Sequence, residues 1–139
     1  MGPIQDCAFC KIIANQIPSV KLVEDDLTLA FMDINPSSDG HCLIIPKTHT
    51  STFFDIEEGD LAAVMHTAKK VALAIKKSLK PDGLRVYQLN GRIAGQIVDH
   101  FHIHLVPLRE NEVAVRHGLR AGDMEKIKAI AAKIAAALA

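Results

Sequence analysis

The chain has 139 residues, of which 49% are hydrophobic, and its 16 basic residues are balanced by 16 acidic residues. This length and apolar content suit one compact domain, so we expect residues 1–139 to form a single domain. A net charge of zero argues against a protein that binds a nucleic-acid backbone, because such proteins usually have a basic surplus. No apolar run is long enough to cross a bilayer and no secretion signal is recognisable, so we expect a cytoplasmic protein that does not contact membranes.

Helices are indicated by apolar residues three and four positions apart, and strands by short apolar or alternating runs. In chain order, the pattern predicts a helix over 10–15, strands over 20–24, 27–33 and 41–45, a helix over 61–79 with Asp60 as its N-cap, strands over 84–90 and 98–106, and a helix that begins near residue 123. Strands that are close in sequence with a helix inserted between them favour an α+β fold with a mainly antiparallel sheet.

Three histidines alternate with apolar residues in the run His100-Phe101-His102-Ile103-His104. In a strand, the three imidazoles would share one face, each about 6.6 Å from the next, and the apolar side chains would pack on the long helix. A solvated strand face would more naturally have Thr, Lys or Glu, so the cluster indicates a functional site. Protonated rings would repel one another, and we expect neutral rings that serve as nucleophile, acid or metal ligand.

A Gly-rich loop over residues 90–96 directly precedes the histidine run. Gly91 and Gly95 allow the backbone to approach a ligand closely, and consecutive amides could bind an anion. Asn90 and Gln96 supply neutral donors that suit phosphate oxygens. Such loops are often ordinary turns, but the position of this one next to the histidines favours a phosphate-binding site.

The chain has three cysteines, and an odd number argues against a framework of disulfides. Cys7 and Cys10 form a C-x-x-C pair, which has a metal-binding and a redox interpretation. Cys42 lies in an apolar run and is expected to be a small buried hydrophobic residue. No role is assigned to the other histidines outside the run and the metal set described below, which are His41, His66 and His117.

Taken together, these motifs resemble the histidine triad (HIT) family of nucleotide hydrolases and transferases. The family motif His-φ-His-φ-His-φ-φ, in which φ is apolar, matches residues 100–106 fully, and the Gly-rich loop is similar to the segment that precedes it in the family. The N-terminal half is similar as well, in the segments Cys7 to Ile13, Glu24 to Asp26, Phe31 to Pro36, Gly40-His41 and Ile44 to His49. The resemblance covers roughly residues 6–108, and we expect residues from about 122 to 139 to form a C-terminal helical extension.

The resemblance implies a five-stranded, mainly antiparallel sheet and a homodimer with a continuous sheet. It also implies that His102 attacks the α-phosphorus of a purine nucleotide and forms a covalent nucleotidyl-histidine intermediate. The bond cleaved would be a phosphoramidate or a phosphoanhydride, as in purine nucleoside phosphoramidases and dinucleoside polyphosphate hydrolases. Water or another acceptor would then release a nucleoside monophosphate such as AMP or GMP.

Further residues receive roles from the resemblance. His104 would contact the phosphate, and Asn90, Gln96 and the backbone amides of Ile97 and Val98 would stabilise charge on the phosphoryl oxygens. Asp33 would bind the ribose hydroxyls. The slot around the base would consist of Phe9, Ile12, Phe31 and Ile34, residue types that also commonly form a core.

Some family members have a structural zinc site, and this chain has the corresponding residues. The four ligands would be Cys7, Cys10, His49 and His100. A Cys₂His₂ set is a closed tetrahedral arrangement, which suits structural rather than catalytic zinc. Two reduced thiols without a metal are the alternative.

Two positions depart from the family pattern. Ile97 follows Gln96 where the family often has Ser or Thr, so a hydroxyl that could hydrogen-bond the leaving group is missing. Leu108 separates Arg109 from the Pro after the triad, so Arg109 receives no role. Two alternatives to the HIT enzyme stay open: a non-catalytic nucleotide- and zinc-binding interaction protein, and a metal-dependent enzyme that uses the triad as ligands. One ion bound by all three histidines would need outer ligands about 13 Å apart to converge.

Overall fold

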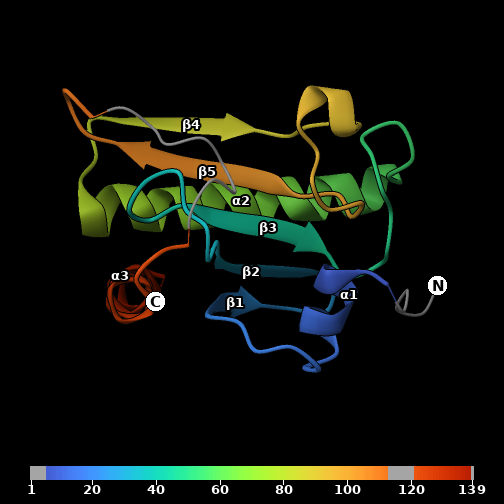
Figure 1. Ribbon diagram of the computed structural model, residues 1–139, viewed down its shortest axis with the longest axis horizontal. Coiled ribbons are helices and arrows are strands. Elements are labelled where there is room, and N and C mark those ends of the chain that lie inside the picture. The colour runs from blue at the N-terminus through green and yellow to red at the C-terminus, as the bar shows by residue number, and fades with distance from the viewer. Residues whose placement is uncertain (1–5, 113–120, 139) are drawn as a thin grey trace.

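The computed structural model describes residues 6–112 and 121–138 (Figure 1). The helices are α1 (Ala8–Ile13), α2 (Glu58–Leu79) and α3 (Met124–Ala137), with a short 3-10 helix η1 (Arg92–Ala94). The strands are β1 (Lys21–Glu24), β2 (Thr28–Met32), β3 (Cys42–Pro46), β4 (Gly83–Tyr87) and β5 (Ile103–Leu108). The α+β class expected from the sequence is confirmed. His117 lies outside the described residues.

The five strands form one antiparallel sheet, as predicted, and their order in it is β1-β2-β3-β5-β4. β1 and β2 form the expected hairpin, whose turn is stabilised by hydrogen bonds from the amides of Leu27 and Thr28 to the carboxylate of Asp25, at 2.9 and 2.8 Å. β5 lies between β3 and β4, so that His104 is opposite Leu43 on one side and Tyr87 on the other. The last histidine of the run is therefore inside the sheet and not at its edge.

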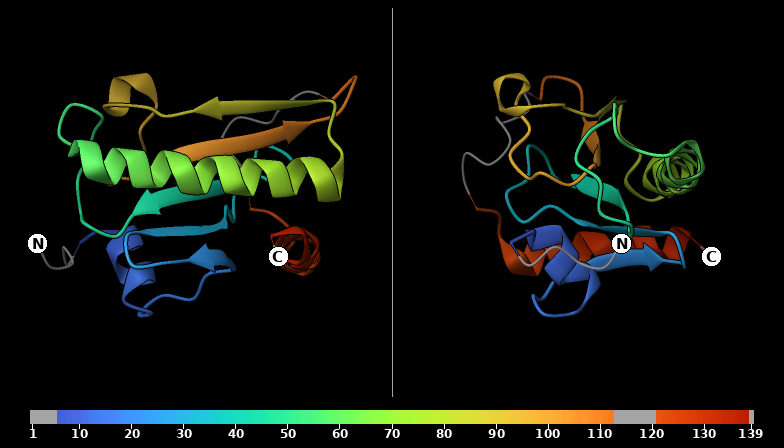
Figure 2. Two further views of the ribbon diagram at one scale, coloured as in Figure 1. Left: turned by 180° about the vertical axis from the view of Figure 1, so that it is seen from behind. Right: turned by 90° about the vertical axis from the view of Figure 1, so that its right-hand side faces the viewer.

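The long helix α2 covers one face of the sheet (Figure 2). Phe101, Ile103 and Leu105 pack there in one core with helix residues that include Val64 and Val71. This confirms that the apolar side of the histidine run faces the long helix. Three buried residues of α3 complete the same core and fix that helix to the domain: Ile127, Ala131 and Ile134.

The short helix α1 lies on the opposite side of the sheet (Figure 2). A second apolar cluster forms between α1 and the alternate side chains of β2 and β3, and its members are Cys7, Phe9, Cys10, Ile12, Leu29, Phe31, Leu43 and Ile45. Because side chains alternate across a strand, β2 and β3 are buried on both faces. The imidazoles of the run are on the α1 side, where the ring of Phe9 contacts His102.

The start of α2 differs from the prediction. The helix begins at Glu58, and Glu57 instead of Asp60 occupies the N-cap position, so the predicted N-cap is wrong. Asp60 lies in the first turn, where a carboxylate interacts favourably with the helix dipole. Lys80 ends the helix in the left-handed conformation (φ 51°), directly before Pro81, which cannot continue it.

The boundaries of α1 and β4 also differ from those predicted. α1 spans 8–13 instead of 10–15, because Cys7 is its N-cap and accepts a hydrogen bond from the Cys10 amide at 3.3 Å. β4 ends at Tyr87 instead of residue 90. No helix in the described part of the chain has the length and apolar content required to span a membrane.

The histidine run is only partly a strand. β5 begins at Ile103 and not at residue 98, so His100 and His102 precede it. The amide of Phe101 donates to the carbonyl of Thr50 at 2.7 Å, a bond to the loop before α2 that replaces a bond within the sheet. The first two histidines are therefore positioned by loop contacts.

Candidate functional site

His102 is 3% exposed, and its ring is oriented by the backbone. Its Nδ1 lies 2.6 Å from the carbonyl oxygen of His100. A carbonyl oxygen can only accept, so Nδ1 has the proton and Nε2 of the neutral ring has the lone pair. The ring of Phe9 contacts His102 edge-on, with centroids 5.1 Å apart. The residue predicted as nucleophile thus has a defined tautomer with Nε2 as the basic atom.

His104 is oriented by a second chain of hydrogen bonds. The amide of Ser37 donates to Nδ1 of His41 at 2.9 Å, so the proton of a neutral His41 is on Nε2. That nitrogen lies 3.0 Å from Nδ1 of His104, which therefore accepts, and the proton of a neutral His104 is on Nε2. Tyr87 stacks on the His104 ring at a centroid distance of 4.4 Å. The ring centroids of His102 and His104 are 4.7 Å apart, so the two oriented imidazoles are neighbours.

His41 was not assigned a role from the sequence, although it is fully buried and contacts His104. It also lies close to Asp33, with His41 Nε2 3.6 Å from Asp33 Oδ2. A histidine directly before an apolar strand was the available signal, since the apolar neighbours indicate that it is buried. Its partner could not be identified locally, because His104 is 63 positions away in the sequence.

One cavity of about 390 Å³ is lined by seven of the predicted nucleotide-binding residues, which are Phe9, Ile12, Phe31, Asp33, Ile34, Ile97 and Val98. The cavity wall is mostly apolar, with Asp33 as its one acidic residue. This size and composition are typical of sites for small organic ligands. Ile34 and Ile97 are 52% and 50% exposed, so a core role does not explain them, whereas Phe9 and Phe31 also belong to the second apolar cluster. Because Phe9 lines the cavity and contacts His102, the cavity lies next to the histidines.

Gln96 is placed differently from the expectation of a direct phosphate donor. Its Oε1 accepts from the amide of Gly91 at 2.8 Å, and its Nε2 donates to the carbonyls of Ser51 (2.7 Å) and Val98 (3.1 Å). The buried side-chain amide is thus occupied by bonds within the protein. Gln96 positions the Gly-rich loop, and the residue type alone could not distinguish this role from ligand binding.

Asn90 and the two glycines complete the Gly-rich loop. The side-chain oxygen of Asn90 accepts from the amide of Phe53 at 2.7 Å and so connects this loop to the one before α2. Gly91 and Gly95 have φ angles of 90° and 104°, which side chains other than glycine rarely adopt. The glycines are therefore required by the path of the loop that leads to Ile97 and Val98.

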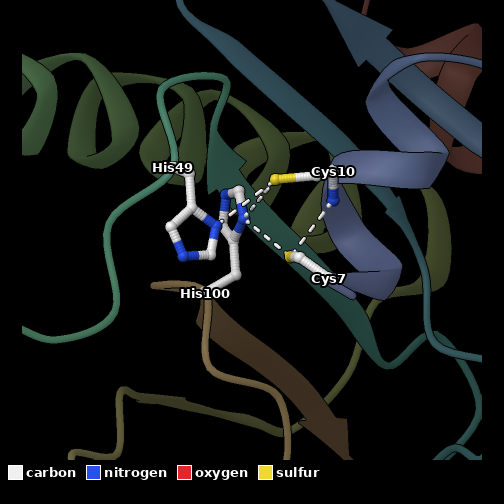
Figure 3. Close-up of side chains that lie close together, drawn as sticks. All are labelled: Cys7, Cys10, His49 and His100. Atoms are coloured by element: carbon white, nitrogen blue, oxygen red, sulfur yellow. Dashed lines mark hydrogen bonds between the residues drawn. The ribbon is translucent and has the colours of Figure 1, made fainter. Parts of the chain in front are cut away.

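The four residues that the family resemblance implies as zinc ligands lie close together in the structure (Figure 3); they are Cys7, Cys10, His49 and His100. The ring of His100 lies with Nε2 2.8 Å from the carbonyl of Pro46, so Nδ1 faces the two thiols, 3.3 Å from Cys7 Sγ and 3.6 Å from Cys10 Sγ. His49 Nδ1 lies 3.3 Å from Cys10 Sγ. Ligand atoms around a tetrahedral zinc would be about 3.4 to 3.8 Å apart, so the donor set fits zinc.

Burial opposes charge on two of the four ligands in the metal-free protein. Desolvation raises the pKa of the Cys7 thiol to about 11 and lowers the pKa of His100 to about 4. A divalent metal would stabilise this set of two cysteines and two histidines, because its charge would replace the proton of the Cys7 thiol. His100 connects this centre to His102, because its ring faces the thiols and its carbonyl accepts a hydrogen bond from His102 Nδ1.

A second group, Asp33, His41 and His104, also has ligand atoms within 4.8 Å of one another. Here the hydrogen bonds argue against a metal, because Nδ1 of His41 accepts from Ser37 and its Nε2 therefore has a proton instead of a lone pair. The triad does not converge on one point either, since His100 faces the thiols and His104 contacts His41. The geometry disfavours a catalytic metal bound by the triad.

Comparisons with known proteins agree with this geometry. The HIT domain family model matches residues 14–111. The adenosine 5′-monophosphoramidase of Schizosaccharomyces pombe is 41% identical over 130 residues, which are 92% of this chain and 95% of that protein. The crystal structure of a Hit-like protein involved in cell-cycle regulation from Bartonella henselae superposes with a TM-score of 0.90 at 36% identity and covers 99% of both chains. A Zn-bound histidine triad family protein from Mycobacterium smegmatis has a TM-score of 0.85 and 32% identity, with 96% of this chain and 93% of that one covered.

Proposed function

This chain belongs to the HIT family, and we propose that it is an enzyme that cleaves a phosphoramidate or phosphoanhydride at the α-phosphate of a purine nucleoside 5′-phosphate. The observation that supports this most directly is the orientation of His102, whose Nδ1 donates to the His100 carbonyl and whose Nε2 is left basic. The similarity to an adenosine 5′-monophosphoramidase makes adenosine 5′-phosphoramidate the first substrate to test.

In the proposed mechanism, Nε2 of His102 attacks the α-phosphorus, the new P–N bond forms, and the bond to the leaving group breaks with its electron pair. The ring becomes cationic, and its Nδ1 proton stays hydrogen-bonded to the His100 carbonyl, which stabilises that charge. His104 and the amides of Ile97 and Val98 stabilise the phosphoryl oxygens. Water then attacks the phosphorus and releases a proton to the solvent, the P–N bond breaks with its electron pair returning to Nε2, and a nucleoside monophosphate is released.

The cavity of about 390 Å³ supports a nucleoside as the bound group. Its apolar side chains suit the flat face of a base, and the carboxylate of Asp33 suits two ribose hydroxyls. Asp33 Oδ1 accepts from the amide of Asn35 at 2.8 Å, so the carboxylate is held in a fixed orientation. AMP and GMP are the expected products.

Zinc would be bound by Cys7, Cys10, His49 and His100. It would stabilise the fold and take part in no step of the reaction. We also propose a homodimer. Its support is β4, an edge strand of the described sheet, where the apolar side chain of Val86 is 53% exposed. Exposed edge strands tend to pair with another chain, so a continuous sheet across two copies would cover β4.

A non-catalytic nucleotide- and zinc-binding protein is the second candidate. The observation that favours it is Ile97, which lines the cavity half-exposed and has no hydroxyl for the leaving group. In the enzyme, the proton for an amine leaving group would have to come from His104 or from water.

The test is AMP release from adenosine 5′-phosphoramidate by the wild type and by His102→Ala. We expect turnover that falls by about a thousandfold or more in the variant, as when a nucleophile is removed. His66→Ala is the matched control, because His66 is exposed on α2 and should leave turnover unchanged. Absence of turnover in both proteins, with AMP still bound, would support the second candidate instead.

A further inference from the structure

We propose that Gly122 and the start of α3 position the loop between β2 and β3 and thereby set the affinity for the nucleoside. This inference rests on the proposed function, in which Asp33 and Ile34 contact the nucleoside. Gly122 and α3 lie beyond residues 14–111, the part of the chain that the HIT domain model matches. No functional role is predicted for them from the sequence.

The loop, residues 33–41, holds two parts of the site through its own backbone. The amide of Asn35 donates to Asp33 Oδ1 at 2.8 Å and orients the carboxylate. The amide of Ser37 donates to His41 Nδ1 at 2.9 Å, and His41 in turn contacts His104. A displacement of this loop would therefore move the ribose-binding carboxylate and the histidine pair together.

The segment before α3 contacts this loop at close range. The amide of Gly122 donates to the carbonyl of Ile34 at 2.8 Å. A Cβ atom at Gly122 would lie 2.8 Å from Pro36 Cδ, 3.0 Å from Pro36 Cγ and 2.8 Å from Ile127 Cδ1. The end of the Ile127 side chain can rotate away, whereas the Pro36 ring is rigid, so glycine allows this approach to the loop. A third contact is the ion pair between Lys126 and Asp39, at 2.9 Å. The three contacts are spread along the loop, at the end of the sheet where the β2–β3 connection and α3 lie together (Figure 1).

The helix is a fixed reference for the loop because its buried face, with Ile127 and Ile134, belongs to the main core. A cavity of about 150 Å³ lies between α3 and the loop, and Asp33 and His41 line it opposite Gly122 and Lys126. Ile34 is the critical link, since its carbonyl accepts from Gly122 while its side chain lines the nucleoside cavity. A displacement of the Gly122 backbone would therefore move Ile34, and with it the wall of the nucleoside cavity.

The experiment is calorimetric titration of AMP into Gly122→Ala, with Gly59→Ala as the control. A methyl group at Gly122 must displace the rigid Pro36 ring, whereas a Cβ at Gly59 meets nothing within 4 Å. We expect the Kd for AMP to rise about fivefold in Gly122→Ala, the factor that corresponds to one lost hydrogen bond, and to stay unchanged in the control. Adding Pro36→Ala removes the Cγ and Cδ atoms of the loop that the methyl group would meet and leaves only the flexible end of Ile127, so it should restore most of the affinity.

A charge variant at an exposed position gives a second test that leaves the packing of the core unchanged. Lys126→Glu places two carboxylates opposite each other on an exposed surface, and Lys128→Glu makes the same change on the same helix away from Asp39. Because an exposed ion pair contributes little, we expect about a twofold rise in the Kd for AMP in Lys126→Glu alone.

Hydrogen exchange separates positioning from a general loss of stability. The amides of Asn35 and Ser37 should exchange faster in Gly122→Ala, while amides in α2 keep the wild-type rate. An unchanged Kd for AMP in folded Gly122→Ala, or equal effects of the two Lys→Glu variants, would overturn the inference and leave the proposed function intact. Failure of the wild type to bind AMP would overturn both together, so the two failures are distinguishable.

Discussion

Loading the centre formed by Cys7, Cys10, His49 and His100 with zinc should raise the midpoint of thermal unfolding strongly. Three sulfur–nitrogen distances between these side chains lie between 3.3 and 3.6 Å. They are close to the separation of about 3.6 Å expected for N and S ligands on one tetrahedral ion. Little rearrangement is therefore needed to bind the metal. The centre also connects three parts of the chain that are distant in sequence, α1, the loop before α2 and the segment before β5.

The magnitude follows from linkage between binding and folding. Free zinc at a hundred times its Kd stabilises the folded state by about 2.7 kcal/mol. A chain of this size gains about 4 °C in Tm per kcal/mol, so the expected rise is about 10 °C. Cys10→Ala removes one of four ligands and should abolish most of that rise.

The assay is thermal unfolding by circular dichroism of metal-free protein, without zinc and with free zinc buffered at about a hundred times its Kd, together with the absorption of the cobalt-loaded form. Cys42→Ala is the matched control, because it removes a buried thiol from the other core and should keep the full zinc-induced rise. An equal rise in Cys10→Ala and wild type, or none in wild type, would refute the assigned ligand set.

Three further predictions concern the histidines and the core. His41→Ala should lower kcat about tenfold or more in steady-state assays, because His104 loses the donor that fixes its tautomer; an unchanged kcat would contradict this. In the metal-free protein, burial lowers the pKa of His100 from 6.5 to about 4, so between these values the unfolded chain binds more protons and stability should fall as the pH is lowered from about 7 to 4. Urea unfolding should show that the unfolding free energy of His100→Asn depends less on pH than that of the wild type. An equal dependence in the two proteins would count against the lowered pKa of His100. Phe101→Ala should cost about 3 to 5 kcal/mol of unfolding free energy, since the ring is fully buried, whereas Phe54→Ala, at an 86% exposed position, should be almost neutral.

The parts of the fold that the sequence predicts are those that local patterns determine. The apolar stripe of α2 and the alternation of Phe101, Ile103 and Leu105 both point to the same core, and the structure has them packed together. The start of β5 was not predictable in this way. The alternation continues back to residue 100, but the bond from the Phe101 amide to Thr50 takes the chain out of the sheet, and that partner is distant in sequence.

The candidate site shows the same limit. The proximity of the four zinc-ligand side chains could be predicted, because the family resemblance identifies these residues as a set. The structure has them close together. The bonds of Gln96 to Ser51 and of His41 to His104 join segments that fold side by side, and no local pattern indicates them. The contact of Gly122 with Ile34 likewise depends on where α3 packs.

The most direct test of the central claim is to find the nucleotidyl group on His102. The enzyme would be mixed with adenosine 5′-phosphoramidate, quenched in alkali, where a phosphorus–nitrogen bond on imidazole survives, and analysed by peptide mass spectrometry. The account predicts an acid-labile AMP adduct on the peptide with residues 100–104, located on His102 by fragmentation and absent from His102→Ala. An adduct on His104 or on another residue, or turnover that persists in His102→Ala, would contradict it.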